Sequence, residues 1–157
     1  MRAAILAIGV SLTLGLSGCT DMPGIGAGPA PGSAPDGAQQ AYFTGYPERL
    51  FVAAGLVCDE PSQSVVRPNA NEVRCESLPN PESAAALILQ YDGTVEDLPK
   101  FVISFKGLQT NEGYLVTADN YIRVPQRDGG AQLIRFPDPQ VSRDMVRLLE
   151  AAGGRPL

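Results

Sequence analysis

The chain has 157 residues and a formal net charge of −5, with 12 basic and 17 acidic side chains, three cysteines and no histidine. An acidic chain lacks the basic surface that nucleic-acid binding requires, so we expect no nucleic-acid partner. The absence of histidine excludes Ser-His-Asp and Cys-His catalysis and removes the commonest transition-metal ligand. We therefore expect no cofactor and no metal site, and favour a protein that is not an enzyme.

The first residues are typical of a secretory signal peptide. Arg2 is followed by an almost wholly apolar run at positions 3–16, and small residues end the run. Such a signal has a positively charged N-terminal region, a short apolar core and small residues before the cleavage site. The run is too short to cross a membrane, because a spanning helix needs about 20 apolar residues.

The end of this run, Leu16-Ser17-Gly18-Cys19, resembles the lipobox of bacterial lipoproteins. The resemblance covers residues 1–19. It implies a signal peptide at 1–18, transfer of diacylglycerol to the Cys19 sulfur, cleavage before Cys19, and acylation of the new amino group, for example with palmitate. A lipoprotein of this kind binds the membrane through the lipid on Cys19, because two or more acyl chains hold a protein stably.

The residue after the lipidated cysteine predicts the membrane in which the protein is located. In enteric-type lipoproteins an aspartate there favours the inner membrane, whereas this chain has Thr20. By this resemblance we expect the protein on the outer membrane, with its domain in the periplasm. The inner membrane and the cell surface remain alternatives.

Composition divides the exported chain into a tether and one domain. Residues 20–40 contain five glycines, four prolines and four alanines, without apolar periodicity. This composition predicts that the lipidated cysteine and the residues up to 40 form a flexible tether. Residues 41–157 have a length typical of a single globular domain.

Cys58 and Cys75 are the two cysteines left after lipidation of Cys19. In an oxidising periplasm an even pair predicts a disulfide. A two-thiol metal site is the alternative, which the lack of histidine and of a CxxC spacing disfavours.

Periodicity and turn residues predict the elements of the domain. We expect helices at 46–56 and 139–152, and strands at 64–67, 72–75, 101–106, 113–117, 121–124 and 132–136. Residues 81–91 fit both patterns, and we favour a helix because Asn80 and Pro81 are typical of a helix start. This order predicts an α+β fold: an antiparallel sheet of about five to six strands with the N- and C-terminal helices packed on one face.

Two groups of residues could carry chemistry. Ser104 and Lys106 lie two apart on one strand, so a lysine-activated serine is conceivable. Residues two apart in a strand are about 7 Å from each other, which favours an ordinary polar face instead. The acidic loop at 92–97 could offer oxygens to Ca²⁺, but it lacks the alternating acidic series of a calcium loop. We expect no catalytic residue in either group.

Three functions of different class remain open. We favour a non-catalytic binding or assembly accessory of the cell envelope, with an unidentified envelope protein or glycan as partner. The second is a small hydrolase that uses two carboxylates in a cleft. The third is a secreted inhibitor or peptide-binding module that captures a strand at an exposed sheet edge.

Replacement of Cys19 by serine tests the anchor. The serine hydroxyl is a much weaker nucleophile than a thiolate, so we expect loss of lipid attachment. The variant should remain unprocessed or become soluble, and it should not incorporate labelled palmitate; any processed form should leave the detergent phase in a Triton X-114 partition. A processed Cys19→Ser protein that still partitions into detergent would overturn the lipobox interpretation.

Overall fold

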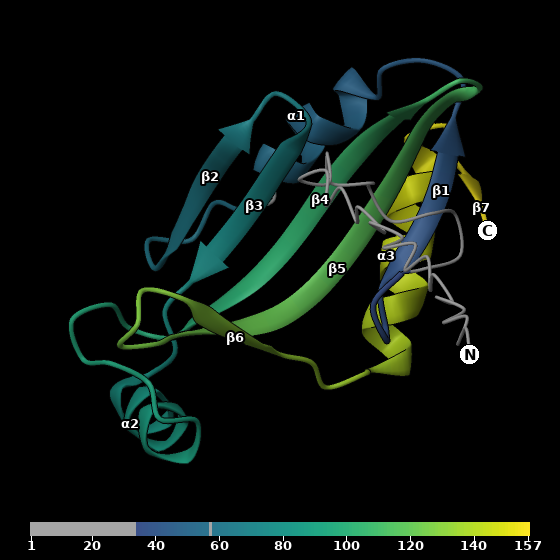
Figure 1. The fold of residues 1–157 in the computed structure, drawn as a ribbon. Coiled ribbons are helices and arrows are strands. Elements are labelled where there is room, and N and C mark those ends of the chain that lie inside the picture. Colours follow the sequence, from purple (N-terminus) through teal and green to yellow (C-terminus); the bar gives the residue numbers. More distant parts are fainter. Residues whose placement is uncertain (1–33, 57) are drawn as a thin grey trace, which may run out of the picture.

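The structure, a computed structural model, describes residues 34–56 and 58–157. The signal peptide at 1–18, Cys19, Thr20 and most of the expected tether therefore lie outside the described residues. The strands of the described part are β1 Gln39–Phe43, β2 Gln63–Asn69, β3 Glu72–Ser77, β4 Lys100–Thr110, β5 Gly113–Pro125, β6 Ala131–Ile134 and β7 Arg155–Pro156 (Figure 1). The helices are α1 Glu48–Leu56, α2 Pro81–Gln90 and α3 Pro139–Ala151.

All the strands pair antiparallel in one sheet with the order β2-β3-β4-β5-β1-β7, and β6 also pairs with β5. Strand β5 is the longest and occupies the centre. Along one side it pairs with the whole of β4. Along its other side it pairs first with β1, at residues 114–118, and then with β6, at residues 122–125.

The α+β class and the antiparallel sheet are confirmed, but the sheet has seven strands rather than five to six. The expected strands at 113–117 and 121–124 are one continuous strand, β5. Two further strands, β1 and β7, were not predicted. Strand β1 begins at Gln39, inside the segment assigned to the tether. Its polar start has no strand pattern of its own, and pairing with β5 imposes the extended conformation, because strand preference depends on neighbours.

Side-chain caps set the start of two helices. The Asn80 side chain accepts a hydrogen bond from the Ser83 backbone N–H at 2.8 Å, and this cap favours the helix over the strand at 81–91. Asp138 Oδ1 accepts from the N–H groups of Gln140 and Val141 at 2.6 and 3.2 Å, as expected for the last helix. The first helix begins at Glu48, two residues later than expected.

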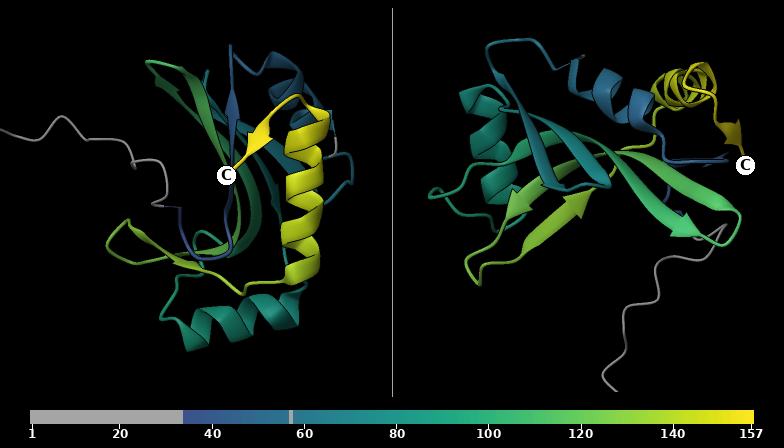
Figure 2. Two further views of the ribbon diagram at one scale, coloured as in Figure 1. Left: turned by 90° about the vertical axis from the view of Figure 1, so that its right-hand side faces the viewer. Right: turned by 90° about the horizontal axis from the view of Figure 1, so that it is seen from above.

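The buried core joins one face of the sheet to α1 and α3. The pairing register places its strand residues on the same face. Its members are Ala41, Phe43, Leu50, Phe51, Ala54, Val73, Phe105, Val116, Ala118, Met145 and Leu149. Figure 2 shows α3 running beside the sheet on this side, whereas α2 lies beyond the end of the sheet. Helix α2 buries only Ala84, so α1 and α3 supply most of the helical part of the core.

The turn between β4 and β5 depends on Gly113. This residue has a φ of +136°, and a Cβ placed on it would lie 2.2 Å from the Phe43 carbonyl oxygen. No side chain fits in that space. Glycine therefore allows β1 to approach the start of β5.

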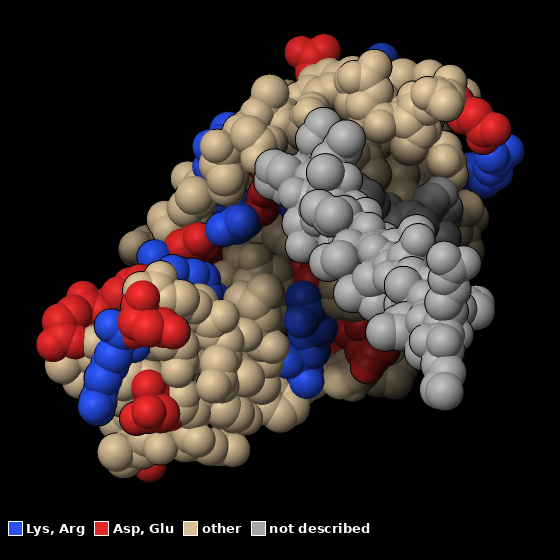
Figure 3. Space-filling model, in the orientation of Figure 1, with Lys and Arg blue, Asp and Glu red and all other residues tan. Residues whose placement is uncertain are grey.

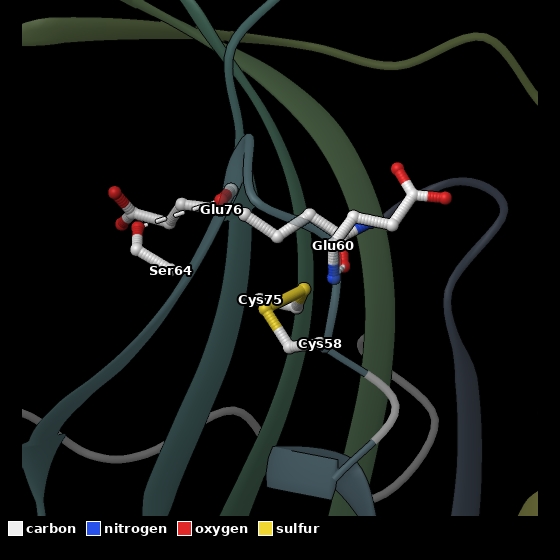
Figure 4. Close-up of a disulfide and its surroundings, with 6 residues drawn as sticks. Cys58, Glu60, Ser64, Cys75 and Glu76 are labelled. Atoms are coloured by element: carbon white, nitrogen blue, oxygen red, sulfur yellow. Dashed lines mark hydrogen bonds between the residues drawn. A yellow bond between two sulfur atoms is a disulfide. The ribbon is translucent and has the colours of Figure 1, made fainter.

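Cys58 and Cys75 form the expected disulfide, with their Cα atoms 5.6 Å apart. The bond joins the segment that follows α1 to the middle of β3 (Figure 4). It closes a loop over a sequence separation of 17 that includes the edge strand β2.

Removal of this disulfide should destabilise the domain. A loop of this size restricts the unfolded chain by about 3 kcal/mol. We expect the free energy of unfolding of the Cys58→Ala/Cys75→Ala variant to fall by about that amount in urea titrations followed by circular dichroism. Both proteins should carry Cys19→Ser, and a reducing agent should lower stability only where the disulfide is present. Equal unfolding free energies would contradict the expectation.

Candidate functional site

The face of the sheet that carries the core continues beyond the helices as an open surface. Three successive cross-strand pairs of β3 and β4 lie on this face: Val73–Phe105, Cys75–Ile103 and Ser77–Phe101. Val73 and Phe105 are buried, with 1% and 3% of their surface exposed. Ile103 and Phe101 are each 43% exposed. The helices therefore cover one end of this face and leave the other end open.

The open end is the floor of a groove of about 370 Å³. One wall comes from β6, the segment after it and the first turn of α3, which contribute Ile134, Phe136 and Val141. Ile134 pairs with Ile122 of β5, and this pairing holds the wall against the floor. Phe136 is 61% exposed. Contiguous large apolar side chains left exposed mark an interaction site in many proteins, so this apolar groove is the candidate functional site.

The polar side chains that line the groove are few. The Asp138 carboxylate is engaged with two backbone N–H groups at the start of α3. The Gln63 side-chain oxygen accepts a hydrogen bond from the Glu60 N–H at 3.3 Å. Ser77, Asn120 and Tyr121 complete the polar lining, and all three are uncharged. No lysine or arginine is among the described residues that line this groove.

The disulfide borders the groove. Cys75 is one of the lining residues, and Figure 4 shows its bond to Cys58 beside the strands. The bond holds the chain that follows α1 close to β3, on the side of the groove away from α3. The two cysteines predicted to pair therefore also help to shape the candidate site, which sequence reasoning did not anticipate.

The opposite face of the sheet carries several ion pairs. Acidic and basic side chains lie next to one another across the visible face in Figure 3. Asp119 accepts three hydrogen-bond contacts from the Arg135 guanidinium, the shortest at 2.7 Å. Lys100 Nζ donates to Glu76 at 2.8 Å, and Arg74 Nε donates to Glu72 at 2.6 Å. The side chains of the three acids are only 8–9% exposed, so each base neutralises a buried carboxylate.

Tyr121 lies within this charged network. Burial raises the pKa of its phenol above the usual value, which keeps the ring neutral. The Arg135 guanidinium lies over the ring, 5.4 Å from its centroid. The hydrogen bonds to Asp119 are the main reason why the pKa of Arg135 is raised. Each of the three buried carboxylates is therefore paired with a basic side chain.

The residues considered for catalysis lie on the same charged face. Ser104 is buried, and its hydroxyl makes a hydrogen bond with Tyr121. Lys106 is exposed on the same face, opposite Glu72 and Thr117 on the neighbouring strands. Ser104 is thus held by a tyrosine rather than presented to solvent, which differs from the exposed polar face suggested by the sequence.

The acidic loop at 92–97 does not gather its carboxylates. Asp97 pairs with Arg123 at 3.0 Å, and Asp92 lies 3.9 Å from Arg127. Glu96 accepts a hydrogen bond from the Thr94 hydroxyl. Within the described residues, no group of three or more His, Cys, Asp or Glu side chains is placed to hold a metal ion.

The chain was compared with known proteins. No protein-family model, no curated protein and no solved structure gave a significant match. In the part of the chain that the structure describes, no helix combines the length and the apolar character needed to cross a membrane.

The Asp119–Arg135 pair gives a stability prediction. In Asp119→Asn the guanidinium loses its charged partner in a largely desolvated place, so we expect the free energy of unfolding to fall by about 3 kcal/mol. Asp97→Asn is the matched control, because Asp97 is also paired with an arginine but its side chain is 49% exposed. That change should cost less than about 1 kcal/mol. Equal losses in urea titrations of the two variants would show that burial of the pair is unimportant.

Proposed function

We propose that this protein is a lipid-anchored lipoprotein of the bacterial cell envelope. Its Cys19 lipid holds it at the outer membrane, and its domain binds a ligand in the periplasm without catalysing a reaction. The apolar groove is the proposed binding site, with α1 and α3 fixed on the same face of the sheet. The lipobox-type sequence supports the anchor, and the groove supports the binding role.

The exposed side chains of the groove carry this proposal. Phe101, Ile103 and Phe136 are between 43% and 61% exposed and line one hollow. Leaving them in contact with water has a free-energy cost of about 25 cal/mol for each Å² of apolar surface, which a bound apolar ligand would remove. Their chemistry favours an apolar ligand over a glycan, because sugar hydroxyls need polar partners that the groove supplies sparsely.

The two other functions have less support. A carboxylate hydrolase needs one protonated and one free carboxyl group in a cleft. Glu72, Glu76 and Asp119 are instead buried against basic partners. Peptide capture at a sheet edge needs a regular open strand. The edge strand β2 contains Pro68 and shifts register between Val66 and Asn69, and both features interrupt pairing with an added strand.

An apolar dye tests whether the groove is a binding site. The dye ANS fluoresces when it binds exposed apolar surface. We expect it to bind the full-length Cys19→Ser protein, and the Ile103→Asn change should weaken that binding about tenfold, because the amide places a polar group in the apolar floor. Leu133→Asn is the matched control. Leu133 is 46% exposed, pairs with Arg123 on the opposite face and does not line the groove.

The two variants must behave differently for the proposal to stand. Circular dichroism should show that both remain folded, because both replaced side chains lie outside the buried core and are similarly exposed, at 43% and 46%. If both variants lose dye binding equally, or neither does, the dye binds elsewhere and the groove is not the binding site.

A further inference from the structure

The backbone that forms the groove floor restricts what can bind there. The floor is built from β3, β4 and β5. Strand β3 is paired with β2 and β4, β4 is paired with β3 and β5, and β5 is paired with β4 along the floor and with β6 from Ile122. Most of the N–H and C=O groups of the floor are therefore used within the sheet. A peptide laid on this floor would bury its own backbone groups without partners, which is costly. A hydrocarbon chain has no such groups to satisfy.

The chemistry of the lining side chains also favours a hydrocarbon ligand. Among the described lining residues the only charged one is Asp138, and its Oδ1 atom already accepts the two N–H bonds of its helix cap. Aromatic, aliphatic and disulfide groups make most of the remaining surface, including Phe101, Phe136 and Cys75. The site therefore offers contact area rather than charge recognition.

The volume of the groove fits a single hydrocarbon chain. Its volume is about 370 Å³, at the small end of ligand pockets. A methylene group occupies roughly the volume share of a water molecule in the liquid, about 30 Å³, so the space corresponds to about a dozen methylenes. A single long acyl chain could lie there with its head group outside.

We infer that the groove takes the hydrocarbon chain of a separate lipid molecule, one long acyl chain at a time. This inference rests on the proposed function, because it names the ligand of the same groove. Binding is driven by apolar contact, so affinity rises with chain length up to the length of the groove. The head group contributes little, because no free charge in the lining can recognise it.

Displacement of ANS by fatty acids tests this inference. The full-length Cys19→Ser protein is used, so that no lipid is attached to the chain itself. We expect palmitate to displace the dye, and hexanoate to do so at least about 100-fold less well, since each methylene adds to the apolar contact. Hexadecanol, which is uncharged, should compete within about threefold of palmitate, in keeping with the uncharged lining.

The groove variants make the test specific. Ile103→Asn should weaken palmitate binding about tenfold, whereas Leu133→Asn should leave it unchanged. If ANS binds in the groove and palmitate fails to displace it, the lipid inference is wrong while the proposed binding site survives. If Ile103→Asn leaves dye binding unaltered, the proposed site itself is wrong. A preference for palmitate over hexadecanol greater than about tenfold would show that a charged head group is recognised and would also overturn the inference.

Discussion

The double pairing of β5 is the constraint on which the rest of the structure depends. This strand pairs with β4 along one side and with β1 and β6 in succession along the other. Between those two partners lie Asp119 to Tyr121, polar residues that would otherwise favour a turn. Strand β4 pairs with β5 across these residues, so the sheet is continuous there. The bidentate contact between Asp119 and Arg135, which directly follows β6, adds a buried ion pair between β5 and the end of β6.

That continuity decides where the groove forms. Because successive residues of a strand point to opposite faces, an uninterrupted β4–β5 ladder carries one apolar face from the core to the far end of the sheet. Phe105 lies under the helices and Ile103 lies beyond them on the same face. Helix α1 has nine residues and cannot cover the whole length of that face. The groove is therefore the uncovered remainder of the core face.

Much of the local structure could be predicted from the sequence, because it depends on local signals. The alternation at 101–106, the cap at Asp138 and the pair of cysteines each gave the correct element or bond. The continuity of β5 could not be predicted, since it depends on pairing with the whole length of β4 rather than on the residues at 118–120 themselves. The strands β1 and β7 are short and take their conformation from pairing rather than from their own residues.

The groove was missed for a different reason. The sequence predicts correctly that Phe101, Ile103 and Phe105 share one face, but a strand pattern does not say how far the covering helices reach. In the folded chain the disulfide holds the segment after α1 at one side of the groove, and the Asp138 cap fixes the start of α3 at the other. Both sides are thus held by local constraints independent of any ligand. A groove shaped before binding has less conformational freedom to lose when it is filled, so even contacts of modest area can give useful affinity.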